Sequence, residues 1–234
     1  MKRTHIRVLL PLLVVGLVVA ALPGQHVLQA TPERVVPSPP VVPNLDAQLR
    51  SFAPQDLVSS LKNPSELQVQ ALPADLGKTR AYDYIVVSYV APLVGGDLLV
   101  LRNVGGRLEL AGTVHAGDDP GLDNGSHLKL VYVDKSGVPA VEIDTPSGDG
   151  MNIITTLFRW TGTQLVSLLP RDVVLTNAYF ADPQGTGLPE IINPQQCLPS
   201  GECNGYWEVY EMKAGEYALA GTSTVDPSGL TPPP

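Results

Sequence analysis

Short apolar runs separated by turns rich in Asp, Gly and Pro fill the chain from Leu67 onward. These runs have the two-residue period and the content of Val, Ile, Tyr and Trp that are typical of β-strands. The clearest turn-then-strand step is ADPQGTGLPEIIN at residues 181–193, and weaker versions occur at residues 75–87 and 134–143. This recurrence predicts one structural unit that is used three times.

Each predicted unit contains four strands, and the units cover residues 65–113, 126–170 and 172–222 of a β-repeat domain at residues 65–224. The predicted strands are residues 67–72, 84–90, 97–102 and 108–113; 128–133, 140–143, 153–160 and 165–169; and 174–180, 191–192, 206–212 and 217–221. A period of about fifty residues is typical of propellers and solenoids. Closed propellers have about four to eight blades. We therefore predict an all-β fold of three four-stranded, propeller-like repeat units in an incomplete or open propeller.

Helical signals outside the N-terminal segment are confined to residues 44–64, which are predicted to form a short N-terminal helical cap on the β domain. Asn44 is a candidate N-cap, apolar residues then recur at helical spacing, and Asn63-Pro64 ends the pattern. Residues 31–43 are rich in proline and predict an extended linker. Residues 225–234 predict a disordered tail.

The first 30 residues have the pattern of a targeting segment. Three basic residues precede an apolar run at residues 8–22, and small residues offer cleavage sites after Ala21 or after Ala30. The run is shorter than the ~20 residues of a typical membrane-spanning helix. A cleaved signal peptide predicts a secreted, periplasmic or extracellular protein. An uncleaved anchor at residues 8–22 is the alternative, and would leave the protein attached to a membrane.

The amino-acid composition fits a fold of short β-strands, and the net charge argues against nucleic acid as a partner. The chain has 23 Pro and 22 Gly, and 16% of its residues are charged, which suits short strands and tight turns better than long solvated helices. The formal net charge is −8 and no Lys/Arg cluster occurs after the first segment. Such a chain is a poor ligand for nucleic acid, and we expect membrane contact only through the N-terminal segment if it is uncleaved.

The two cysteines, Cys197 and Cys203, lie close together in a segment with Pro and Gly. In an oxidising compartment two neighbouring cysteines predict a disulfide bond. A metal site would need further Cys or His residues nearby, and the sequence has none there.

These repeats resemble the FG-GAP/VCBS repeats of integrin-α-like β-propellers. The likeness rests on the turn Asp182…Gly187-x-x-Glu190, on the aliphatic strand directly after it, and on an aromatic-rich strand with a polar-Gly hairpin at residues 157–162. It covers about residues 65–222. Proteins with such repeats are mostly extracellular, and the repeats serve in adhesion, in ligand binding or as accessory domains.

The resemblance also implies a possible Ca²⁺ loop. The family pattern is Asp-x-(Asp/Asn)-x-Asp-Gly-x-x-Asp, and Ca²⁺ needs six to eight oxygen ligands, many of them charged. In the third unit the matching positions are Asp182, Gln184, Thr186 and Glu190, so two acids of the pattern are replaced. The alternative is a structural turn, in which Asp182 caps backbone N–H groups and Gly187 supplies a positive φ. No other cofactor is predicted.

Catalytic motifs are absent from the sequence: it has no Gly-x-Ser-x-Gly elbow, no phosphate-binding Gly loop and no His-Glu-x-x-His. His115 and His127 flank an acidic loop at residues 117–125, which leaves a secreted hydrolase as one alternative. A structural cell-surface protein without a specific small ligand is another. The hypothesis favoured by the sequence is an exported, non-enzymatic binding or interaction module whose partner is a protein or another extracellular ligand.

Overall fold

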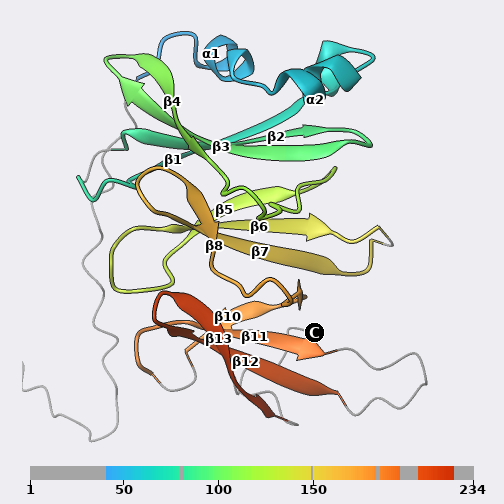
Figure 1. Cartoon of the computed structure of the whole chain (residues 1–234), viewed down its shortest axis with the longest axis vertical. Coiled ribbons are helices and arrows are strands. Elements are labelled where there is room, and N and C mark those ends of the chain that lie inside the picture. Colours follow the sequence, from blue (N-terminus) through green and yellow to red (C-terminus); the bar gives the residue numbers. More distant parts are fainter. Residues whose placement is uncertain (1–40, 80–81, 149, 183–184, 196–204, 224–234) are drawn as a thin grey trace, which may run out of the picture. The chain divides into compact units, whose positions relative to one another are not determined.

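The computed structural model describes residues 41–79, 82–148, 150–182, 185–195 and 205–223, and within them the chain forms three antiparallel β-sheets (Figure 1). Sheet A contains β1 (Gln68–Ala74), β2 (Tyr84–Ala91), β3 (Gly95–Val104) and β4 (Arg107–Thr113). Sheet B contains β5 (His127–Val131), β6 (Ala140–Pro146), β7 (Ile153–Trp160) and β8 (Leu165–Ser167), with β9 (Leu175–Thr176) paired to β7. Sheet C contains β10 (Tyr179–Ala181), β11 (Glu190–Gln195), β12 (Tyr206–Lys213) and β13 (Glu216–Ser223). Each sheet is open, and its four main strands follow one another in chain order.

The predicted mostly-β fold with three sets of four consecutive strands is confirmed. One predicted strand, at residues 174–180, is wrong. Asn177 adopts the left-handed conformation (φ 52°) and divides this segment, so that β9 joins sheet B and β10 begins sheet C. The Asn177 side chain also accepts a hydrogen bond from the backbone N–H of Ile153 (2.8 Å), which holds the break against sheet B.

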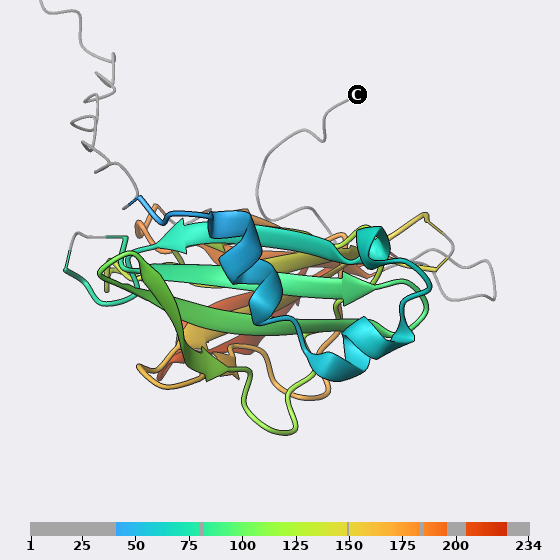
Figure 2. The same cartoon turned by 90° about the horizontal axis from the view of Figure 1, so that it is seen from above.

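The predicted helical cap is present as α1 (Leu45–Ser51) and α2 (Gln55–Ser60), followed by a 3₁₀ turn, η1 (Pro64–Glu66). Figure 2 shows both helices crossing the face of sheet A. Asn44 occupies the N-cap position of α1 but makes no side-chain capping bond, because its backbone is left-handed (φ 52°). The buried Tyr89 hydroxyl donates to the Leu49 carbonyl (2.6 Å) and fixes α1 to β2. No helix among the described residues is long and apolar enough to span a membrane.

Three hydrophobic cores hold these layers together. The first joins the helices to sheet A, the second joins sheet A to sheet B, and the third joins sheet B to sheet C. Strand β2 is apolar at nearly every position because both of its faces are covered, and its one serine, Ser88, is also buried. Val87 and Tyr89 point to the helices, whereas Val86 and Val90 point to sheet B.

A glycine allows sheets A and B to approach closely at β4. A Cβ atom on Gly112 would overlap the carbonyl oxygen of Thr163 and would lie 2.7 Å from the ring of Trp160. Beside this contact, Val114 forms a parallel bridge with Leu165. The hairpin between β7 and β8 therefore rests on the backbone of β4, which only a residue without a side chain permits.

Candidate functional site

Loops of sheets A and B form a groove of about 750 Å³ that combines apolar and acidic residues. The turn between β2 and β3 forms one wall, the acidic loop after β4 forms a second, and the end of β6 with the following turn forms a third. Its lining residues are Pro92 to Gly96, Asp119, Gly121 to Asn124, Thr145 to Gly148, and Ile154. Among the described residues, the lining contains the carboxylates of Asp119 and Asp123 and no Lys, Arg or His side chain.

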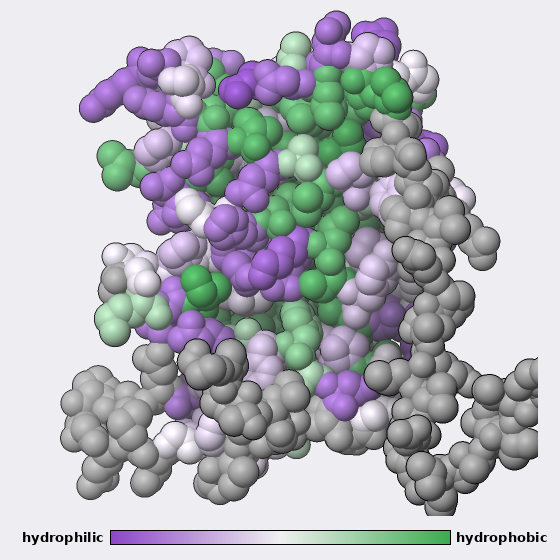
Figure 3. All heavy atoms as spheres, turned by 180° about the vertical axis from the view of Figure 1, so that it is seen from behind, coloured by the Kyte–Doolittle hydropathy of each residue, from purple (hydrophilic) through white to green (hydrophobic). Residues whose placement is uncertain are grey.

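Leu93 stands out in this groove because it combines an exposed apolar side chain with a left-handed backbone. Its side chain is fully exposed, and its backbone is left-handed (φ 68°), a conformation that a leucine adopts only at a cost. Its neighbour Val94 is also exposed. Residues held in sparsely populated backbone conformations cluster at functional sites. Apolar residues also reach the surface between polar ones elsewhere, as Figure 3 shows on the face opposite to that of Figure 1.

Within the acidic loop, the carboxylates are used to shape the backbone. Asp119 accepts from the N–H of Gly121 (2.8 Å), and Asp118 accepts from the N–H of Ser167 in sheet B (3.0 Å). The predicted catalytic candidate His115 places its Nδ1 atom 3.3 Å from the side-chain oxygen of Gln164. Across the described part of the chain, no three or more His, Cys, Asp and Glu side chains are arranged to hold a metal ion. The loop thus connects sheets A and B, and the ring of His115 contacts Gln164.

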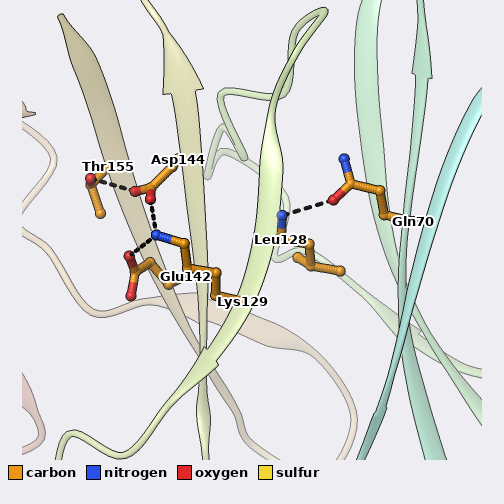
Figure 4. Close-up of polar contacts among 6 residues, drawn as sticks. All are labelled: Gln70, Leu128, Lys129, Glu142, Asp144 and Thr155. Carbon is orange, nitrogen blue, oxygen red and sulfur yellow. Dashed lines mark hydrogen bonds and ion pairs between the residues drawn. The ribbon is translucent and has the colours of Figure 1, made fainter.

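A second polar group, the Lys129 cluster, consists of Lys129, Glu142, Asp144 and Thr155 in the middle of sheet B (Figure 4). Glu142 and Asp144 lie two residues apart on β6, so their side chains point to the same face. The Lys129 ammonium bonds to Asp144 and lies 3.4 Å from Glu142, and the Thr155 hydroxyl donates to Asp144 (2.8 Å). None of the four residues lines the groove. The sequence analysis missed this cluster, although its acid-apolar-acid alternation at residues 142–144 is visible in the sequence.

Burial raises the pKa of the Glu142 carboxyl above its ordinary value of 4.5, and the neighbouring Asp144 carboxylate raises it further, against the opposing charge of Lys129. The hydrogen bond to Asp144 raises the pKa of Lys129, so this ammonium stays charged. The cluster therefore has two carboxylates and one fixed positive charge. Such an arrangement favours a proton on Glu142 more strongly in the folded state than in the unfolded state.

We predict that Glu142→Gln removes a pH-dependent loss of stability. Because the folded protein holds the Glu142 proton more tightly than the unfolded chain does, the free energy of unfolding falls as the pH rises from about 4.5 through the folded pKa. Glutamine cannot lose this proton, and Lys129 keeps Asp144 as its partner. Urea denaturation at several pH values should show the variant at least as stable as the original protein at pH 7 and no more stable than it at pH 4.

Glu109→Gln is the matched control for this experiment, since Glu109 is an exposed glutamate on β4 of sheet A. This variant should keep the full pH dependence of the original protein. If Glu142→Gln changed the slope of the stability curve no more than the control does, burial of Glu142 would have no energetic consequence.

The predicted Ca²⁺ loop forms a turn that is organised by Asp182. Its carboxylate accepts hydrogen bonds from the N–H groups of Thr186 (2.8 Å) and Gly187 (2.6 Å), and Gly187 has a positive φ of 73°. Partial desolvation raises the pKa of Asp182, but these bonds outweigh it and leave the pKa below its ordinary value. Glu190 is buried at the start of β11. Both oxygens of Asp182 thus bind the backbone of the turn, as the structural alternative requires.

Several predicted features lie outside the described residues. They are Gln184, the disulfide between Cys197 and Cys203, the targeting segment with its cleavage sites at Ala21 and Ala30, residues 31–40 of the predicted linker at 31–43, and the tail at residues 225–234. The chain matches no protein-family model, and no curated protein shows a significant match to it.

Proposed function

We propose that the chain is an exported, non-catalytic interaction module, built from three FG-GAP/VCBS-like units in a propeller-like order, that binds a segment of a partner protein in the groove between sheets A and B. The exposed, strained Leu93 is the observation that carries this proposal. Neither strand pairing nor core packing calls for an apolar side chain at this position. A leucine there gains free energy only when another molecule covers it.

The proposed units rest on the common strand order of the three sheets and on the face-to-face cores between them. In a propeller-like arrangement the turns between the second and third strands of successive units come to the same end. The groove contains two such turns, at residues 92–94 from sheet A and at residues 147–148 from sheet B. Loops that a rigid sheet framework holds in place are common positions for binding residues.

Charge and shape define the class of partner. The groove presents apolar side chains from Leu93, Val94 and Ile154 beside the carboxylates of Asp119 and Asp123, with no cation among its lining residues. The complementary ligand is an extended segment in which apolar and basic residues alternate. Its basic side chains would meet the carboxylates and its apolar side chains would cover Leu93.

A peptide titration tests this assignment. The probe is the synthetic peptide Leu-Lys-Leu-Lys-Leu-Lys, followed by changes in the amide NMR signals of the isotope-labelled protein. We expect the largest shifts at the groove residues Gly95, Gly121 and Gly148. Leu93→Asn should weaken binding about tenfold, the effect of losing about 1.4 kcal/mol of contact energy, because asparagine keeps the left-handed backbone but removes the apolar contact.

Two controls make the result specific. The peptide Leu-Glu-Leu-Glu-Leu-Glu should not bind, since it meets the carboxylates with like charge. Leu110→Ser removes another exposed leucine of sheet A, away from the groove, and should leave binding unchanged. Equal binding of the two peptides, or an equal effect of the two leucine variants, would contradict the proposed recognition.

A further inference from the structure

The turn at residues 123–126 carries an exposed asparagine–glycine pair, Asn124 and Gly125, beside the groove. The backbone N–H of Ser126 donates to the Asp123 carbonyl (3.0 Å) and closes the turn. Gly125 has a positive φ of 86°, which a type II turn requires at its third residue. Asn124 is one of the residues that line the groove. Its side-chain amide is therefore open to water at the candidate site.

An asparagine that precedes a glycine can lose its side-chain amide without an enzyme. The backbone nitrogen of the glycine attacks Cγ of the asparagine and gives up its proton, and the Nδ2 atom leaves as ammonia. Water then opens the five-membered succinimide ring. Hydrolysis at Cγ gives aspartate, and hydrolysis at the backbone carbonyl carbon gives isoaspartate, in which the main chain runs through the former side chain. Glycine favours the attack because it has no Cβ atom in the way.

The two nitrogen atoms that react are not held by hydrogen bonds. Within the described part of the chain, neither the N–H of Gly125 nor Nδ2 of Asn124 donates one. The bound atom of the amide is Oδ1, which accepts from Gln68 Nε2 (2.6 Å). A donor at this oxygen draws electrons from Cγ and makes it easier to attack. Loss of ammonia thus breaks no described contact, and Gln68 can donate to the new carboxylate as it does to the amide.

We propose that Asn124 is a site of spontaneous deamidation that changes the charge of the groove. The aspartate product adds a third carboxylate to the lining, beside those of Asp119 and Asp123. A groove with one more negative charge attracts a basic segment more strongly. The modification depends on the turn alone, whereas its effect on binding rests on the proposed function of the groove.

The isoaspartate product acts differently, because it lengthens the main chain between residues 124 and 125. The hydrogen bond from Ser126 to the Asp123 carbonyl cannot keep its geometry in the longer turn. The Ser126 hydroxyl also accepts from the N–H of Asp123 (2.8 Å) and bonds to the Thr145 hydroxyl of sheet B (2.7 Å). Displacement of the turn therefore loosens this wall of the groove. We expect the isoaspartate form to bind the basic peptide more weakly than the aspartate form does.

Peptide mapping of the protein during incubation at pH 8 and 37 °C tests the modification. Trypsin releases Asn124 in the peptide of residues 108–129, where it is the only asparagine. We expect this peptide to separate with time into the original form and two products, both with the mass increase of an NH₂ group replaced by OH. Mapping also keeps the site apart from Asn204-Gly205, the other asparagine–glycine pair of the sequence.

Asn44 is the internal control, because it is also exposed but precedes Leu45, whose side chain hinders the attack. Its tryptic peptide, residues 35–50, likewise contains no other asparagine and should stay unchanged. An unchanged peptide 108–129, or equal conversion of the two peptides, would overturn the proposal.

Two variants measure the effect of the added charge on the groove. Asn124→Asp supplies the aspartate product from the start, and Asn124→Gln keeps a neutral amide that cyclises far more slowly because its ring is six-membered. The first should bind Leu-Lys-Leu-Lys-Leu-Lys about two- to fivefold more tightly than the second, the effect of one exposed charge pair. Equal affinities would contradict the effect on binding. If neither variant binds the peptide, the proposed function of the groove fails, and conversion at Asn124 is judged by the mapping alone.

Discussion

Gly112→Ala is expected to destabilise the protein by about 3 kcal/mol or more, the upper part of the range for overpacked interiors. The new methyl group would overlap the Thr163 carbonyl and the Trp160 ring, so the hairpin between β7 and β8 would have to move away from β4. The atoms in the way are backbone and a buried aromatic ring, neither of which can yield by changing a rotamer. The loss equals a large part of the 5–15 kcal/mol by which domains are typically stable. Urea denaturation followed by circular dichroism measures it.

Gly148→Ala is the corresponding control, since no described atom lies within 4 Å of the Cβ position at Gly148. An alanine there should change stability by less than about 1 kcal/mol and should even stabilise slightly by restricting the unfolded chain. If both glycine variants lost the same free energy, the cause would be a general property of glycine replacement, and the close approach of sheets A and B would not explain the effect.

Much of the fold could be predicted from local patterns. Strand β7 has the predicted bounds Ile153–Trp160, and the β2 run of apolar residues and the two helices also lie where periodicity and proline positions placed them. In each of these elements, the secondary structure that the local sequence favours is also the one that buries its apolar side chains. The break at Asn177 could not be predicted in the same way. Its left-handed backbone depends on a hydrogen bond to Ile153, which is far away in sequence.

Less of the candidate site than of the fold could be predicted from the sequence. The groove depends on loops from two sheets that meet only after folding, and a surface leucine such as Leu93 has no signature in the sequence. The acidic loop at residues 117–125 is the basis of the hydrolase alternative, and in the structure its Asp118 and Asp119 hold the loop in shape. The repeat of Leu-Ala-Gly-Thr at residues 110–113 and 219–222 is a further signal in the sequence that aligns sheets A and C directly.

The second large effect is expected from two neighbouring residues of β7 that point to opposite faces. Leu157 is fully buried in the core between sheets B and C, and Phe158 is buried in the core between sheets A and B. Leu157→Ala should cost about 2–5 kcal/mol and Phe158→Ala about 3–5 kcal/mol, because each leaves a cavity in a packed interface. Urea denaturation measures both losses.

The two variants also test whether the sheets unfold together. In a row of units that contact only their neighbours, stability comes from the interfaces as much as from each unit, and sheet B contributes to two of them. Loss of either core should therefore destabilise the whole row and preserve one cooperative transition. Trp160 reports on the core between sheets A and B, and Trp207 reports on sheet C. Fluorescence of Trp160→Phe and Trp207→Phe versions should give coincident unfolding curves in each background. Separate transitions would mean that the interface between sheets B and C is too weak to couple them.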